Sequence, residues 1–326
     1  MNPRHGVLTQ LPLRVTLNPV FDVRQLDVAA SAYVSTVPAI RYGGAFMEYK
    51  TIMVHLDAHP RRQARLEIAL KLAAKTGGHL IGLFSVNLLV TPRNVDGQWS
   101  AGLMAAVREQ MAAACSQAQA EFQAVCAGYP DVRTEWREDA GGALEAATLS
   151  AGYADLVIAG QDQRDAEIDP RVGAHFAEDL VLAVPRPVLL IPYTGRFDSL
   201  GVRVLLAWNS SPQALHAATG AMPLLTGAKE VSVMVFDPEK DKEGHGEEPG
   251  ADISLFLARH GVKASVSSQR SIDGDVGCAI LSRAADMSAD LIVMGAYGHS
   301  RTRERILGGA TRTIFESMTV PVLMSH

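Results

Sequence analysis

The stretch that decides the fold runs from residue 289 to residue 313 and reads ADLIVMGAYGHSRTRERILGGATRT. Its first six residues carry no charge after Asp290 and are aliphatic and β-branched, which is typical of a buried parallel strand. Gly295 and Gly298 then allow a sharp turn where a Cβ would obstruct the backbone. Gly308 and Gly309 precede an apolar-periodic run that indicates a helix. The stretch therefore predicts a strand, a glycine-containing loop and the start of a helix.

The loop between the two glycine pairs has the composition of an anion site. At a helix N-terminus, unpaired N–H groups and the helix dipole point at the same spot and favour a negative charge. Residues 296–307 contain three arginines (Arg301, Arg303, Arg305) and one acidic residue (Glu304), a net charge of +2. This charge suits phosphate.

Working outward, strand and helix patterns alternate from residue 51 to the C-terminus. The predicted strands are 51–57, 79–87, 131–138, 154–160, 187–193, 202–209, 230–237, 262–269, 289–295 and 320–325. The predicted helices are 60–76, 100–127, 142–151, 173–184, 212–226, 251–261, 274–287 and a last one that ends near residue 318. Such alternation predicts an α/β fold, with parallel strands and helices on both faces of the sheet.

The pattern contains an internal repeat. ADLVIAG at 154–160 matches ADLIVMG at 289–295, and RPVLLIP at 186–192 matches VPVLMSH at 320–326. We therefore expect two domains, 47–195 and 200–326, on either side of the polar linker TGRFDSL. Residues 1–46 lack lysine and periodicity. We interpret them as an unstructured or mis-annotated extension, with Met47 as a candidate start, rather than as a signal peptide.

Composition excludes several classes of protein. At 326 residues and 48% hydrophobic, the chain is long enough for two cores, and its net charge of −5 argues against a general nucleic-acid binder. Its three cysteines have no metal-type spacing, and no uncharged apolar run reaches the length of a membrane span. The histidines, including His55 and His299, suggest no metal site. We expect a cytoplasmic protein that binds neither membranes nor nucleic acids.

The repeat and the glycine spacing together resemble the universal stress protein family. That family carries the signature G-x2-G-x9-G-[S/T] after the fourth strand. Here Gly295, Gly298 and Gly308 fit the spacing, and Gly309 stands at the hydroxyl position. The resemblance implies two tandem, doubly wound, five-stranded parallel sheets. It also implies strand order 3-2-1-4-5, in an adenine nucleotide alpha hydrolase-like fold.

The resemblance also implies a nucleotide site in the second half, at the crevice where the strand order reverses. Its cofactor would be ATP, or AMP or ADP, with Mg²⁺ as a candidate companion ion. Base and ribose would be lined by Ala207, Trp208, Asn209 and, through its backbone, Val235. Met294 and Gly295 would lie under the ribose and phosphates. The phosphate cradle would comprise Gly298, His299, Gly308, Gly309, Ala310 and Thr311.

Two of these positions have a second interpretation. ATP-binding members carry Asp where this chain has Asn209, which accepts through one oxygen and is a weaker match for two ribose hydroxyls. Asn209 is equally suited to cap the helix that follows, as are Ser210 and Ser211. Gly309 lacks the signature hydroxyl, for which Thr311 is a candidate source. Trp208 fits a core position better than base stacking.

The first half has a degraded version of the same site. Gly160 and Gly173 keep the outer spacing, but Gln163 and Ala174 replace the other signature residues. Residues 161–172 carry a net charge of −2, which opposes phosphate binding at short range. Asp57 stands at the end of the first strand, where ATP-binding family members carry the Asp that binds the ribose. We expect this half to bind no ATP, or to bind it much more weakly, and to support the second half.

No catalytic signature is present, so the expected function is a non-catalytic, ATP- or AMP-dependent switch in the stress response that a protein partner reads. Two alternatives stay open: a nucleotide-free interaction or chaperone-like protein, and a weak ATPase that uses His299 or Glu304. Family members dimerise through the fifth strand. We therefore expect Pro187–Tyr193 to pair with Val320–Ser325 as a pseudo-dimer within the chain, with a homodimer as a further option.

Overall fold

A computed structural model describes residues 48–57, 61–87, 101–139, 142–162, 172–173, 175–240, 248–271, 274–296 and 309–326. All of them belong to one compact unit that spans Phe46–His326. Within this part of the chain, no helix is long and apolar enough to cross a membrane.

Strands and helices alternate in both halves, as the sequence predicts. The first half comprises β1 (Thr51–Leu56), α2 (Arg62–Thr76), β2 (His79–Ser85), α3 (Ala101–Cys126), β3 (Arg133–Asp139), α4 (Ala143–Ala151), β4 (Leu156–Gly160), α5 (Phe176–Ala183) and β5 (Val188–Ile191). The second half comprises β6 (Arg203–Trp208), α6 (Pro212–Gly220), α7 (Met222–Leu225), β7 (Glu230–Phe236), the 3-10 turn η2 (Pro238–Lys240), α9 (Ala251–Arg259), β8 (Ala264–Gln269), α10 (Val276–Asp286), β9 (Leu291–Gly295), α11 (Gly309–Ser317) and β10 (Val322–Ser325).

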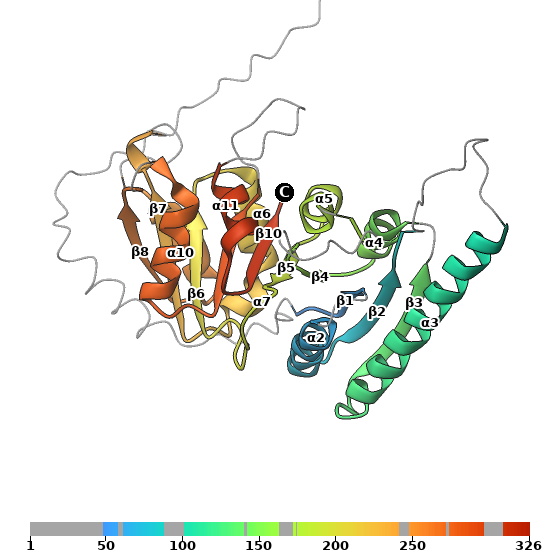
Figure 1. The fold of residues 1–326 in the computed structure, drawn as a ribbon. Coiled ribbons are helices and arrows are strands. Elements are labelled where there is room, and N and C mark those ends of the chain that lie inside the picture. The colour runs from blue at the N-terminus through green and yellow to red at the C-terminus, as the bar shows by residue number, and fades with distance from the viewer. Residues whose placement is uncertain are drawn as a thin grey trace, which may run out of the picture. The chain divides into compact units, whose positions relative to one another are not determined.

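The strands form a single ten-stranded sheet in the order β3-β2-β1-β4-β5-β10-β9-β6-β7-β8 (Figure 1). Counted within its own half, each set of five has the predicted order 3-2-1-4-5. The pairs within a half are parallel, whereas β5 and β10 pair antiparallel, with Leu323 opposite Leu189. The predicted pairing of the two fifth strands is confirmed. Because the halves run in opposite directions, their strands' C-terminal ends lie at opposite edges of the sheet.

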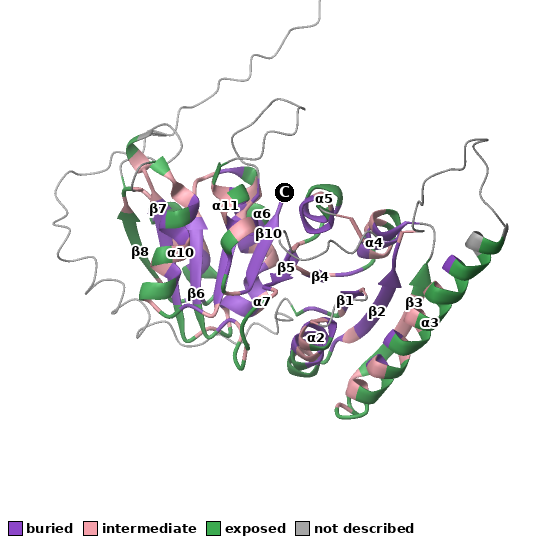
Figure 2. Ribbon diagram, in the orientation of Figure 1, coloured by how far each residue is buried: buried purple, intermediate pink, exposed green. Residues whose placement is uncertain are grey.

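Two hydrophobic layers cover the two faces of this sheet. Alternate residues of a strand enter different layers: Ile52 and Val54 belong to the layer that includes α2, α6 and α7, whereas Met53 belongs to the layer that includes α4, α5, α10 and α11. Figure 2 shows buried residues along the central strands and exposed residues on the outer sides of the helices. The α2 residues predicted to share one face, Leu66, Ala69, Leu70 and Ala73, are all buried.

The single helix predicted for 212–226 is wrong, because the structure breaks it at Ala221. Pro223 has no N–H with which to continue the ladder, and the N–H of Ala221 bonds to the carbonyls of Ala217 and Thr219. The helix predicted for 60–76 does end where expected. Gly77 follows it with φ of 63°, in the left-handed region that favours glycine, and its N–H bonds to Ala73 O.

Candidate functional site

The sheet brings together the predicted residues at the C-terminal ends of β6, β7 and β9. Ala207 is in register with Met294 on one side, and Trp208 is in register with Val235 on the other. Ala207, Val235 and Met294 have buried side chains, and the contact of Val235 with a base through its backbone stays a prediction. Trp208 is partly buried and packs against the core, which agrees with its predicted core role.

Asn209 follows β6 directly and organises the turn into α6. Its Oδ1 accepts hydrogen bonds from the backbone N of Ser211 at 3.3 Å and from Ser211 Oγ at 2.7 Å. Ser211 Oγ in turn accepts from the N–H of Ala214 at 3.1 Å. The helix cap is therefore Ser211, and the interpretation of Asn209 as the cap itself is wrong. Asn209 orients the cap, at the edge of the sheet where the ribose was predicted.

Gly295 ends β9 and lies against the first turn of α6. A Cβ at this position would be 2.5 Å from the backbone N of Ala214 and 2.9 Å from Gln213 Cβ. No side chain fits so close to a helix backbone. Packing of α6 against the sheet therefore requires glycine at this position, whether or not a ligand binds.

The predicted phosphate cradle is described in part. Gly309 begins α11, Ala310 follows it, and Thr311 is buried at 4% exposure. Apart from its own helix backbone and chain neighbours, no described atom lies within 4 Å of a Cβ built on Gly309, so packing against the described residues does not require this glycine. The predicted ligands Gly298, His299 and Gly308 lie outside the described residues, as do Arg301, Arg303, Glu304 and Arg305.

In the first half, charged side chains of the chain itself occupy the matching strand ends. Arg65 Nη2 forms an ion pair with Asp57 Oδ1 at 2.5 Å, with the two side chains 4% and 14% exposed. The same guanidinium lies over Gly160, where a built Cβ would be only 2.2 Å from Arg65 Nη1. The residue that keeps the ribose position, Asp57, is thus already engaged by a cation inside the crevice.

The N-terminus of α5, which matches the predicted phosphate end of α11, is also occupied. Both carboxylate oxygens of Asp162 lie 3.1 Å from the N–H of Ala177 in the first turn. Burial, followed by repulsion from Glu178 and Asp179, raises the pKa of Asp162 to about 7, against the lowering effect of the Ala177 N–H. A side-chain carboxyl group therefore stands where the resemblance places a phosphate.

Sequence reasoning missed the roles of Arg65 and Asp162. One signal was available for Arg65: it lies next to Leu66 on the buried side of α2, where an arginine needs a partner. For Asp162, the net charge of the loop predicts an environment that opposes phosphate binding. It gave no indication that this carboxylate folds back onto α5.

His55 lies in β1 and is buried at 1% exposure. Its Nε2 is 3.1 Å from Ser85 O, and its ring centroid is 4.3 Å from that of Phe176. Burial lowers the pKa of His55 to about 4, so the imidazole is neutral at pH 7. Among the described residues, no three metal-ligating side chains form a group able to hold an ion.

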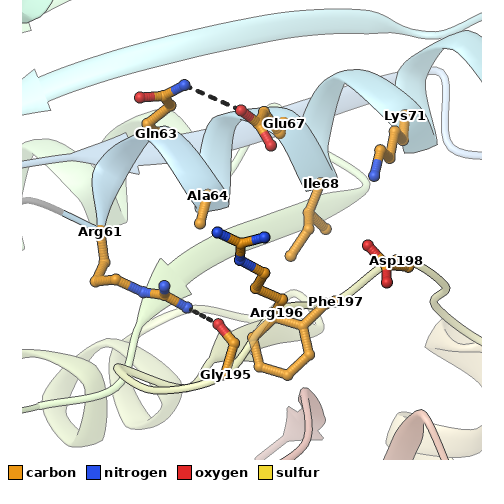
Figure 3. Close-up of a pocket in the computed structure, with 10 residues that line it drawn as sticks. All are labelled: Arg61, Gln63, Ala64, Glu67, Ile68, Lys71, Gly195, Arg196, Phe197 and Asp198. Carbon is orange, nitrogen blue, oxygen red and sulfur yellow. Dashed lines mark hydrogen bonds between the residues drawn. The ribbon is translucent and has the colours of Figure 1, made fainter.

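A pocket of about 480 Å³ lies between α2 and the linker that joins the halves (Figure 3). Its walls carry charges of both signs, among them Lys71 and Asp198 at one end, and Arg61 donates to Gly195 O at the other. The apolar part is formed by Ala64, Ile68 and Phe197. None of the predicted nucleotide-binding residues borders this pocket, so it is separate from the predicted site.

A model of the universal stress protein family matches residues 203–326. A universal stress protein from Synechocystis sp. is 27% identical over 175 residues, which cover 53% of this chain and 58% of that protein. Both matches support the resemblance to the universal stress protein family. The match thus spans less than two thirds of the length of this curated relative.

Solved structures show the same fold. A universal stress protein from Archaeoglobus fulgidus gives a TM-score of 0.61 at 16% identity, covering 84% of this chain and 94% of that chain. A protein of unknown function from Pseudomonas aeruginosa gives 0.50 at 16% identity, covering 84% and 92%. At such identities the likeness concerns the fold alone. The repeated strand order extends the universal stress fold to the first half, which the family model does not match.

Proposed function

We propose that the second half of this chain binds an adenine nucleotide and acts as a non-catalytic switch in the stress response. The observation that carries the proposal is the family signature spacing of Gly295, Gly298 and Gly308 in the sequence, together with the place of Gly295 at the end of β9, the strand next to β6. Binding at the N-terminus of α11 would be favoured by its unpaired N–H groups and dipole.

The expected ligand is ATP, ADP or AMP, with Mg²⁺ as a candidate companion ion. One solved universal stress protein is in complex with cAMP, which is a property of that protein. A nucleotide that binds one conformer of this half more tightly than another would shift the population of conformers, which a protein partner can read without any turnover. We place this switch in the cytoplasm, because the three cysteines are free thiols, as in reducing compartments.

One observation favours a second candidate, a nucleotide-free interaction or chaperone-like protein. Asn209 and Gly309 each remove a hydrogen-bonding group that the family signature supplies. If the two losses together disable the pocket, partner binding would have to proceed without nucleotide.

The first experiment is mass spectrometry of small molecules released from the denatured, purified chain, together with calorimetric titration of ATP. We expect about one nucleotide per chain, lost in Gly298→Asp because the added carboxylate repels phosphate and crowds the signature loop. Gly102→Asp is the matched control. Gly102 is exposed in α3, and no described atom lies within 4 Å of its Cβ position.

Three other outcomes would count against parts of this proposal. No released nucleotide and no binding heat would favour the nucleotide-free candidate. Two nucleotides per chain would contradict the assignment to the second half alone. Steady ATP turnover, abolished by His299→Ala or Glu304→Ala, would contradict the non-catalytic role and favour the weak ATPase.

A further inference from the structure

Three consecutive residues at the end of β4, Gly160, Gln161 and Asp162, are all engaged by the protein itself. Gly160 is covered by the Arg65 guanidinium, and Asp162 holds the N-terminus of α5. Gln161 lies between them and is 7% exposed. In the degraded site of the first half, this segment is therefore held in place with no external ligand.

Gln161 reaches out of its own half. Its Nε2 donates to the carbonyl of Phe315 in α11 at 2.8 Å, across 154 positions of the sequence. Its Oε1 accepts from the N–H of Tyr193 at 3.3 Å. The side-chain amide thus connects the end of β4, the end of the first half and the helix of the predicted nucleotide site.

The carbonyl of Phe315 needs such a donor. It is among the last four carbonyls of α11, which have no partner within the helix. The neighbouring carbonyl of Ile314 receives the N–H of Met318 at 2.9 Å, and Phe315 receives Gln161 instead. Phe315 is 3% exposed, so an unsatisfied carbonyl there would carry the cost of a buried, unpaired acceptor.

The residue of the second half that matches Gln161 makes no equivalent side-chain bond to α5. The N–H groups of Gln161 and Ala296 make equivalent bonds to the ends of β5 and β10, through Ile191 O and Ser325 O. The two residues therefore occupy matching positions. Ala296 has no polar side chain and cannot support α5 as Gln161 supports α11.

We propose that the closed crevice of the first half is an anchor for the nucleotide helix, with Gln161 as the positioning residue. α11 has nine residues, too few for a helix to be stable without tertiary contacts. Gln161 holds its C-terminal end, which leaves the N-terminal end, at the opposite edge of the sheet, ready for an anion. Anchoring before binding lowers the ordering cost that the ligand must overcome. Only this last, affinity-related step rests on the proposed function.

The test is backbone amide hydrogen exchange of the full chain without nucleotide. Gln161→Glu keeps the acceptor for Tyr193 N–H but replaces the donor to Phe315 O with a carboxylate oxygen. We expect amides at 314–318 to exchange about tenfold faster, because a buried hydrogen bond is lost, and those of α5 to stay unchanged. Gln161→Met preserves volume in case the charge impairs folding. Gln123→Ala, on the exposed side of α3, is the control.

If amide exchange became equally faster in α5 and α11, Gln161 would have only a general packing role. Unchanged exchange in α11 would also contradict the proposal that Gln161 anchors this helix. A second readout is ATP titration, in which the Gln161 variants should bind several-fold more weakly than wild type. If the wild type shows no ATP binding, the proposed nucleotide function fails, and the exchange data still decide whether Gln161 holds α11.

Discussion

At the scale of single residues, the glycines of the second half fall into two kinds. Gly295 is required by the fold, because a Cβ would enter the backbone of α6. Packing against the described residues does not require Gly309, since none of them outside its own helix and chain neighbours lies within 4 Å of its Cβ position. The sequence presents both as parts of one signature. Only the structure shows that packing requires glycine at 295, whereas Gly309 differs from the signature by the absence of a hydroxyl.

Gly309→Ser therefore restores the family hydroxyl without crowding the described atoms around it. We expect it to bind ATP about two- to twelvefold more tightly than wild type, the gain of one net hydrogen bond of about 0.5–1.5 kcal/mol. Calorimetric titration measures the change. Gly309→Ala is the matched control, because it fills the same space with no donor. Equal affinity of the Ser and Ala variants would show that the hydroxyl does not reach the ligand.

Residues whose roles depend on strand register were predictable from sequence. Ala207, Trp208, Val235 and Met294 meet because they end adjacent parallel strands, and period and topology determine that much. Arg65 was missed because its role depends on the direction of a long side chain, which follows from packing rather than from pattern. The sequence likewise did not distinguish Asn209 from Ser211 as the cap.

At the scale of elements, the carboxyl group of Asp162 at the N-terminus of α5 makes the free energy of unfolding depend on pH. The pKa of Asp162 is raised to about 7, chiefly by burial, whereas an unfolded aspartate titrates near 3.9. The folded state therefore holds an extra proton between about pH 4 and pH 7. In that window the contribution of Asp162 to the free energy of unfolding falls as the pH rises.

Asp162→Asn should lack this contribution. We expect the stability of wild type relative to the variant to fall by up to about 4 kcal/mol from pH 4 to pH 7, the product of a shift of about three units and 1.36 kcal/mol per unit. Urea denaturation of both proteins across this range measures it. His55, whose pKa is lowered to about 4, works in the opposite direction but is common to both proteins. Parallel profiles would contradict the assignment.

Element boundaries were predictable where a local chemical signal marks them. Gly77 ends α2 because its left-handed conformation suits glycine. The break at Ala221 carried the same kind of signal in Pro223, but the apolar periodicity of 212–226 concealed it. Element type was correct throughout the described strands and helices, because buried parallel strands and amphipathic helices differ in period as well as composition.

At the scale of the whole molecule, the junction between the halves is a buried sheet seam. Val188, Leu189 and Leu190 pair with Met324, Leu323 and Val322, and all six are completely buried. The hydroxyl of Tyr49, just before β1, donates to Gly220 O in α6 at 2.7 Å, which adds a contact between the halves. The pairing of the fifth strands was predicted from the family resemblance, because family members dimerise through this strand. The Tyr49 contact had no sequence signal.

Residues 200–326 expressed alone would lose β5 and expose the edge of β10. An unpaired, apolar strand edge is a template for pairing with another chain, so we expect this fragment to form a homodimer through two copies of β10. Light scattering gives the mass, and amide exchange should show β10 as protected as in the full chain, where its edge is already occupied. The contrary result is a fragment that stays monomeric throughout the micromolar range and whose β10 amides exchange fast. It would mean that strand pairing alone does not form the seam, which then needs contacts specific to the first half, such as that of Tyr49.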